Sequence, residues 1–154
     1  MSLPLTVLAP VSGRVLAMAQ VPDPVFAESM VGPGLAIDPD SDAGAAVAVA
    51  PVAGKILKLH PHAYVIVSES GRGVLVHLGI DTVQLKGEGF RLIASEGDEV
   101  AAGAPVVEWD PRGITAGGRS PVCPVVALDA TAEDVRGLAA FGHIECGAEL
   151  YAWQ

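Results

Sequence analysis

Residues 73–83 place a single histidine at the end of an apolar run. Gly, Val, Leu and Val precede His77, and Leu, Gly, Ile and Asp follow it. An aliphatic run of this kind is typical of a strand buried on both faces. Imidazole titrates near neutral pH, and its unprotonated nitrogen can act as a nucleophile, a base or a metal ligand. By burial statistics alone, a lone histidine on such a strand is more often a core residue.

A second histidine changes this expectation, because the chain is predicted to fold back between the two. Residues 60–67 form another strand-like run, and residues 68–73 between the runs are rich in turn formers. A hairpin that reverses near Gly71 would bring His62 close to His77 across the ladder. The turn leaves the register open, and therefore also the face of the sheet on which each imidazole lies.

Composition describes a compact, turn-rich domain of 154 residues, with 51% hydrophobic and 18% charged residues. The net charge of −9 argues against a nucleic-acid or anionic-membrane surface and favours a basic partner. The two cysteines, Cys123 and Cys146, are too few and too far apart for a disulfide framework. Because the sequence contains neither a long apolar span nor a signal pattern, we expect no direct membrane insertion and a cytoplasmic location.

The chain carries an internal duplication that predicts an all-β architecture. Residues 8–16 and 49–57 share one pattern of apolar, Ala, Pro, Val, small, Gly, basic and β-branched positions. A second related pair ends in Trp109 and Trp153, each six residues after a Gly. Such strand and turn units use Gly and Pro at their turns. At most one short helix is expected, beginning after Thr131, which has the form of an N-cap.

Residues 21–34 open with X-Pro pairs, close with Pro-Gly and gather several apolar side chains in a short space. Two interpretations stay open for this segment. It is either a loop that plugs one end of a barrel or an apolar rim that binds a partner.

Residues 76–90 read VHLGIDTVQLKGEGF. This stretch resembles the phosphorylation-site signature of the glucose-type enzyme IIA of the bacterial phosphoenolpyruvate:sugar phosphotransferase system, and the resemblance runs nearly end to end. It implies a flattened antiparallel β-sandwich or barrel and a single domain over residues 1–154, with residues 1–4 as a flexible N-terminus. It also implies that His77 is phosphorylated and that His62 is its active-site neighbour.

The resemblance further implies a phosphocarrier that takes the phosphoryl group from the histidine-containing phosphocarrier protein. The group would pass to the IIB domain of a glucose-family sugar permease, and the phosphorylation state could regulate other proteins. No cofactor and no metal are implied, since the phosphoryl group is carried covalently on His77. Supporting site residues are Gly79, Asp81 and His60, with the Gly79 carbonyl holding Nδ1 of His77. The predicted partner-binding residues are Asp23, Val25, Phe26, Met30, Val31, Leu75 and Val83.

The segment before His62 departs from the family pattern. Where the family usually has a threonine two residues before this histidine, the chain has His60, and residues 55–62 are one residue longer than usual. The family threonine helps to order the hydrogen bonds of the phosphate and the histidine. The sequence leaves open whether His60 replaces that residue or points away.

Two other classes of protein compete with a phosphocarrier. A zinc hydrolase would use His60 and His62 on one face of a strand with His77 as a third ligand. Pro61 would disturb that strand, and the sequence shows no evident general base nearby. A biotinyl or lipoyl carrier is suggested by the Pro-Val-x-Gly repeats, but the lysine hairpin needed for attachment is missing.

Overall fold

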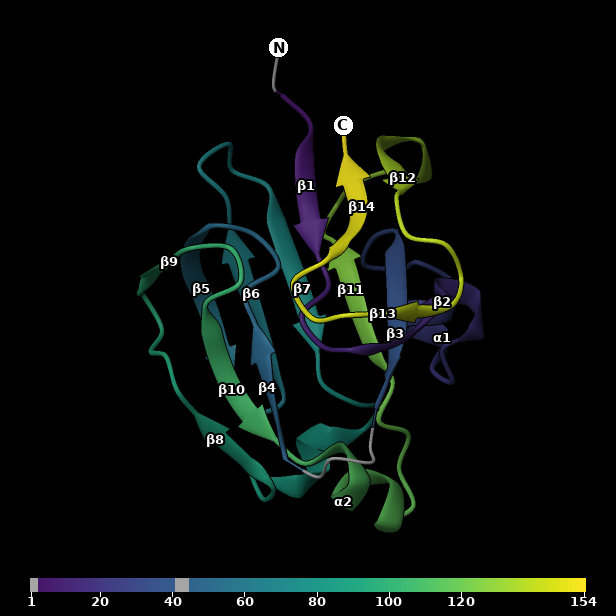
Figure 1. Cartoon of the computed structure of the whole chain (residues 1–154), viewed down its shortest axis with the longest axis vertical. Coiled ribbons are helices and arrows are strands. Elements are labelled where there is room, and N and C mark those ends of the chain that lie inside the picture. The colour runs from purple at the N-terminus through teal and green to yellow at the C-terminus, as the bar shows by residue number, and fades with distance from the viewer. Residues whose placement is uncertain (1–2, 41–44) are drawn as a thin grey trace.

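The computed structural model describes residues 3–40 and 45–154 as a two-layer β-sandwich (Figure 1). All strand pairs are antiparallel. The large sheet has the order β13-β2-β3-β11-β7-β6-β5-β9, with bounds His143–Ile144, Gly13–Ala17, Gly34–Pro39, Cys123–Ala127, Gly73–His77, Ala63–Val67, Gly54–His60 and Glu99–Val100. Facing it are β1 (Leu5–Leu8), β14 (Glu149–Trp153) and β12 (Val135–Gly137), and separately β4 (Ala46–Val49), β10 (Pro105–Trp109) and β8 (Phe90–Leu92).

The two small sheets repeat one arrangement, which confirms the predicted duplication. In each small sheet, a strand that leads into one of the repeated segments pairs with a strand that ends in tryptophan. β1 pairs with β14, which ends at Trp153, and β4 pairs with β10, which ends at Trp109. The repeats also bond to each other, since the amide of Leu8 donates to Pro51 O (2.8 Å) and that of Val49 to Pro10 O (3.0 Å). The all-β prediction is therefore confirmed, with both repeats built into one sandwich.

The main core fills the space between the layers. Tyr64, Tyr151 and Trp109 are its largest fully buried side chains. Both tyrosine hydroxyls donate across the sandwich, Tyr64 to Val49 O (2.7 Å) and Tyr151 to Val125 O (3.0 Å). These bonds satisfy polar groups that would otherwise be costly in an apolar interior. Cys123 is buried and Cys146 exposed, and both are free thiols, as the cysteine count indicated.

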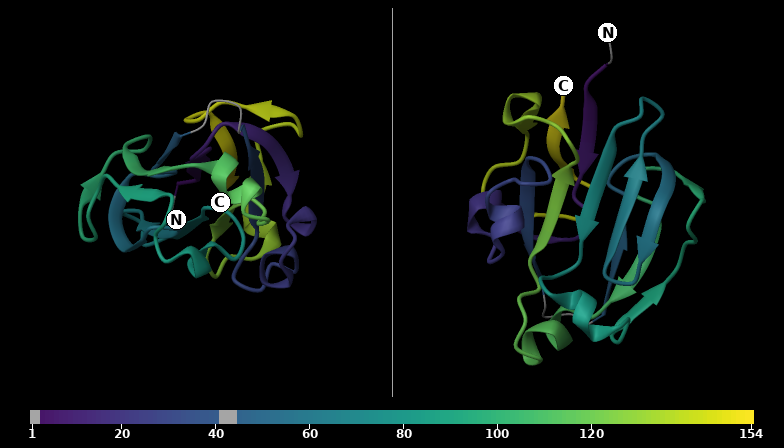
Figure 2. Two further views of the ribbon diagram at one scale, coloured as in Figure 1. Left: turned by 90° about the horizontal axis from the view of Figure 1, so that it is seen from below. Right: turned by 180° about the vertical axis from the view of Figure 1, so that it is seen from behind.

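A smaller core lies on the outer face of the large sheet. Along β3 and β11, Ile37 and Val125 belong to the inner core, whereas their neighbours Ala36 and Val126 belong to the outer one. Met18, Val21 and Phe26, from residues 18–32, pack on these outward side chains. The segment therefore covers part of a sheet face, and it is not a plug in the end of a barrel. Figure 2 shows this segment beside the sheet, away from the chain termini.

The helix prediction was wrong in both number and place. Two short α-helices are present in the described residues, α1 (Pro24–Ala27) and α2 (Pro111–Ala116). The residues after Thr131 form a 3-10 turn, η3 (Ala132–Asp134), because the chain enters β12 directly afterwards. Two more 3-10 turns are η1 (Met18–Gln20) and η2 (Thr82–Leu85). None of the described helices has the length and apolarity that a membrane crossing requires.

Both ends of the described chain lie at the same end of the sandwich (Figure 1). The Arg72 guanidinium donates to Leu3 O (2.5 Å) and to Trp153 O (2.6 Å), and it also lies over the Trp153 ring. Residues 1 and 2 of the predicted flexible N-terminus lie outside the described residues. The Arg72 contacts place the chain termini at the Gly73 end of β7, and His77 is at its other end.

Candidate active site

The predicted hairpin is present, and its register brings the two histidines together. Val67 pairs with Gly73 at the closed end, and Ala63 pairs with His77 at the open end. The Leu78 amide donates to His62 O (2.7 Å), which extends the pairing by one step. His62 itself lies in the turn between β5 and β6, so the predicted strand over residues 60–67 was wrong at its start. Pro61 ends the strand because its fixed φ and missing N–H suit a turn.

β7 is not buried on both faces, contrary to the expectation from its composition. Val74 and Val76 are fully buried in the inner core, whereas Leu75 and His77 on the outer face are only partly covered. The outer core reaches Leu75 but stops short of a complete layer. This incomplete cover leaves His77 accessible at the end of the strand.

The tautomer of His77 is fixed by one backbone carbonyl. Nδ1 of His77 lies 2.6 Å from Gly79 O. A carbonyl oxygen only accepts hydrogen bonds, so Nδ1 carries the proton and donates it to Gly79. Nε2 then keeps its lone pair free for attack.

The loop after β7 holds the Gly79 carbonyl in place. Gly79 has φ +81°, a left-handed conformation that favours glycine. The next amide, that of Ile80, donates to Ser120 O (2.9 Å). Thr82 is fully buried, and its hydroxyl donates to Leu78 O (2.8 Å). These bonds fix the residues on both sides of the Gly79 carbonyl.

A Gly79→Ala substitution should destabilise the protein and displace the carbonyl that holds His77. A Cβ at this position would lie 2.7 Å from Thr82 Cγ2 and 3.1 Å from Ser120 O. Left-handed backbone alone costs a non-glycine residue about 1–2 kcal/mol, and the clash adds to this. Gly71→Ala is the matched control, since Gly71 has φ +86° with nothing within 4 Å of the new Cβ. Denaturant unfolding that shows equal losses for both variants would contradict this account of the loop.

His62 lies beside His77 as a second imidazole. Their ring centroids are 5.3 Å apart and the planes meet at 70°, an edge-to-face arrangement. Burial, which has the largest effect, and the neighbouring His77 and His60 rings together lower the pKa of His62 to about 4. His62 is therefore neutral near pH 7, with one N–H available as a donor.

Phe26 also packs against His77. The two rings lie 5.2 Å apart at 56°, and Phe26 is 9% exposed. Phe26 is positioned by α1, whose N-cap Asp23 accepts a bond from the Val25 amide (2.9 Å). Pro24 at the first helical position suits this start, because its missing N–H would have no helical partner there.

Burial lowers the pKa of His77, while the Gly79 bond, Asp23 and Asp81 act in the opposite direction. We expect an NMR titration of the His77 ring to show a midpoint below the ordinary value of 6.5. Since the unfolded chain binds this proton at higher pH than the folded chain, the unfolding free energy should fall as the pH drops below 6.5. A midpoint at or above 6.5 would contradict the buried, neutral imidazole.

The predicted partner-binding residues differ in how far their side chains are exposed to solvent. Met30 (69%), Val83 (59%) and Val25 (40%) are exposed large apolar side chains. Phe26 is buried, and the remaining members are half-buried: Asp23, Val31 and Leu75. Asp81 is exposed in a left-handed conformation just before η2. Partner binding by this set remains a prediction.

Thr82 and Ser120 support the site and were missed from the sequence. Thr82 belongs to the motif that carries His77, and its place in that motif was the available signal. Ser120 lies about forty positions later in the chain, and nothing local links it to Ile80. Its contribution is a backbone carbonyl, which side-chain identity does not reveal.

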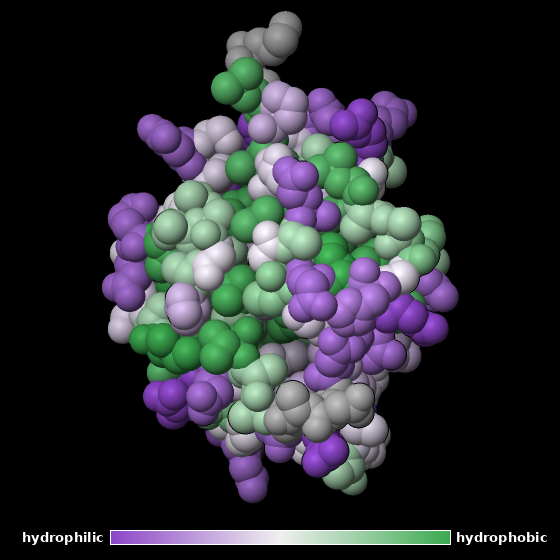
Figure 3. Space-filling model, viewed as in Figure 1, coloured by the Kyte–Doolittle hydropathy of each residue, from purple (hydrophilic) through white to green (hydrophobic). Residues whose placement is uncertain are grey.

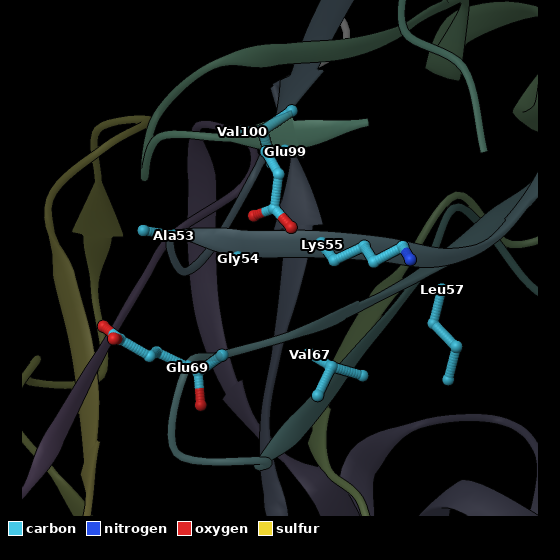
Figure 4. Close-up of a pocket in the computed structure, with 9 residues that line it drawn as sticks. Ala53, Gly54, Lys55, Leu57, Val67, Glu69, Glu99 and Val100 are labelled. Atoms are coloured by element: carbon cyan, nitrogen blue, oxygen red, sulfur yellow. The ribbon is translucent and has the colours of Figure 1, made fainter. Parts of the chain in front are cut away.

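A cavity of about 710 Å³ lies away from the histidines. Its lining includes Gly54 and Val67, at the ends of β5 and β6 opposite His60 and Ala63. Figure 4 shows that the charged ends of Lys55, Glu69 and Glu99 point in different directions around it. Because these groups do not converge on one point, this cavity is not the candidate site.

The zinc interpretation loses its structural basis. His60 ends β5 and His62 lies in the following turn, so the two are not alternate residues of one strand. Within residues 3–40 and 45–154, no group of three or more His, Cys, Asp or Glu side chains could hold a metal ion. The geometry instead describes a half-buried imidazole with a fixed tautomer and a free Nε2, next to a neutral second imidazole. An imidazole with a free Nε2 has the lone pair that nucleophilic attack requires.

Comparisons with known proteins identify the family to which the chain belongs. The family described as phosphoenolpyruvate-dependent sugar phosphotransferase system, EIIA 1, matches residues 5–132. The glucose permease IIA from Mycoplasma capricolum has a similar structure, with a TM-score of 0.86 at 32% identity over 99% of this chain and 97% of that one. The chain therefore belongs to the EIIA 1 family of this phosphotransferase system, which confirms the prediction from residues 76–90.

Two curated relatives illustrate how the domain is used elsewhere. The N-acetylglucosamine-specific EIICBA component of Escherichia coli (strain K12) is 40% identical over 144 residues, 91% of this chain and 21% of that protein. The glucose-specific EIIA component of Staphylococcus aureus (strain Mu50) is 37% identical over 124 residues, 79% of this chain and 72% of that protein. The chain thus spans about a fifth of the EIICBA relatives and most of the EIIA relative.

Proposed function

We propose that this protein is a phosphocarrier that accepts a phosphoryl group on Nε2 of His77. The donor is the histidine-containing phosphocarrier protein, and the acceptor is the IIB domain of a glucose-family sugar permease. The observation that carries the proposal is the bond from Nδ1 of His77 to Gly79 O, which leaves Nε2 unprotonated. Family membership supports the direction of transfer, a cytoplasmic location and a reaction without a metal cofactor.

The reaction moves one phosphoryl group between two imidazoles. The Nε2 lone pair of His77 attacks phosphorus as the N–P bond of the donor breaks. Nδ1 keeps its proton and its hydrogen bond to Gly79 O. The His62 ring, whose centroid is 5.3 Å from that of His77, would donate its N–H to the phosphoryl oxygens. In phosphoryl transfer the charge spreads over these oxygens, so positioned donors contribute most of the rate.

Apolar side chains around His77 exclude water from the phosphohistidine. Phe26 lies against the imidazole, and Leu75 packs into the same outer core. A site that excludes water protects a reactive intermediate from hydrolysis. Met30, Val25 and Val83 then remain exposed for a partner to cover.

The test is incubation with phosphoenolpyruvate, enzyme I and the histidine-containing phosphocarrier protein, followed by intact-mass analysis. One acid-labile phosphoryl group should be added, and it should move on when a IIB domain is supplied. A protein that stays unmodified while a known EIIA is phosphorylated in the same mixture would overturn the proposal. Omitting the phosphocarrier protein is the control for direct transfer from enzyme I.

Docking should be fast, salt-sensitive and short-lived. The net charge of −9, with Asp81 exposed beside the site, should steer a basic donor toward His77. Salt at 1 M shortens the Debye length to about 3 Å and should therefore slow association. Asp81→Asn should reduce the association rate, and Met30→Ala should increase the dissociation rate by removing an apolar contact.

A control for this prediction comes from the opposite layer. Figure 3 shows hydrophobic side chains on the face formed by the small sheets, beside β8 and β10, where Leu92 is 44% exposed. Leu92→Ala removes apolar surface from the layer opposite the sheet that carries His77, and it should leave both rates unchanged. Stopped-flow kinetics that are indifferent to salt and equal for Met30→Ala and Leu92→Ala would contradict docking on the His77 face.

A further inference from the structure

His60 lies at the end of a row of three imidazoles. Its ring stacks on His62 with centroids 5.7 Å apart and planes at 23°, and His62 in turn meets His77 edge to face. His60 is exposed, whereas His62 and His77 are half-buried. His60 therefore does not point away from the site.

A β-bulge places His60 on the same face of the sheet as His77. The register between β5 and β6 shifts between Ile56 and Lys58. Ile56 and Leu59 both face the inner core, although three positions separate them. In a regular strand, side chains alternate, so residues 56 and 60 would share the inner face. The extra residue at the bulge reverses this phase and turns His60 outward.

The following turn fixes the distance between the two rings. His60 pairs with Ala63, so Pro61 and His62 are the central residues of the turn. Proline restricts φ at the first central position, which limits how the chain can carry His62 away from His60. Pro61 also lies close to Gly87 of the following loop, 3.4 Å from the position of a Gly87 Cβ.

We propose that His60 is a positioning residue for phosphoryl transfer, whose ring holds the His62 imidazole edge-on to His77. This inference rests on the proposed function and adds a residue to its site. A stacked ring presents its face to His62, so it limits rotation of the His62 side chain and forms no in-plane hydrogen bond with it. The longer segment before His62, with its bulge, is what makes this contact available.

The kinetic test compares His60→Ala with His60→Phe in transfer from phosphorylated protein to a IIB domain. An aromatic contact of ordinary strength corresponds to a loss of between about twofold and tenfold in kcat for His60→Ala. KM for the IIB domain should not change, since His60 acts through His62. His60→Phe, which keeps a flat ring, should restore most of kcat. His143 is another exposed histidine, on β13, and three strands separate it from β7, so His143→Ala should behave like wild type.

An NMR measurement on the unphosphorylated protein separates this inference from the proposed function. The His62 ring signals should shift in His60→Ala, as the ring-current effect of a stacked neighbour is lost, and His60→Phe should retain a ring-current effect. Unchanged His62 signals together with unchanged kcat in His60→Ala would overturn the inference. A change in KM alone, or a kcat that His60→Phe fails to restore, would also overturn it. If no protein accepts phosphate, the proposed function fails, and the NMR result still decides whether His60 orders His62.

Discussion

Replacing His77 with alanine should abolish phosphoryl acceptance. The imidazole provides the attacking Nε2, and Gly79 fixes its tautomer through Nδ1 at 2.6 Å. His62 cannot substitute, because it lacks that carbonyl contact and lies in the turn. The expected result is complete loss of the acid-labile phosphoryl group in the mass spectrum.

His143→Ala serves as the control for this loss. His143 is exposed and its Nε2 lies 2.8 Å from Asp40 Oδ2, in a separate part of the large sheet. Its removal should leave acceptance intact. If His77→Ala retained a phosphoryl group under conditions that label wild type, the assignment of His77 would be wrong.

Replacing His62 with glutamine should separate acceptance from onward transfer. His77 keeps its free Nε2, so the protein should still become phosphorylated. The glutamine amide can donate a hydrogen bond, but it does not reproduce the edge-on position of the ring, so the phosphoryl oxygens lose a positioned donor. Loss of one such donor costs on the order of 10²–10³ in rate. Onward transfer to a IIB domain should fall by about that factor.

Rapid-quench kinetics of the isolated phosphoprotein with a IIB domain measure this step directly. Measuring acceptance in the same preparation shows that His62→Gln is folded and loaded. Onward transfer at the wild-type rate would make His62 a bystander, however close its ring is to His77.

Local patterns predicted the elements that contain the site. The apolar runs on either side of the Gly71 turn form the hairpin, and the repeated Pro-Val-x-Gly segments form the duplicated sheets. The motif at residues 76–90 predicted the family, which is confirmed, and through that resemblance it predicted His77 as the phosphorylated residue, because the residues of the motif lie close together in the chain. These features depend on neighbours within a few positions, which the sequence displays directly.

Long-range packing could not be predicted in the same way. The composition of residues 21–34 did not decide between a loop that plugs a barrel end and an apolar rim that binds a partner. The contact of Phe26 with His77 depends on how α1 packs against the large sheet. No distinctive residue type in the sequence marks the bulge in β5, yet this bulge determines the face of the sheet on which His60 lies. Register and packing of this kind follow from contacts between distant segments.

The most direct test of the central claim is the identity of the phosphorylated atom. Protein labelled with ¹⁵N in its histidine rings, phosphorylated through the phosphocarrier protein, should show phosphorus coupled to Nε2 of His77, with Nδ1 still protonated. Phosphorus on Nδ1 of His77 would contradict the role of Gly79, since that nitrogen donates to its carbonyl. Phosphorus on any other residue would contradict the assignment of the site.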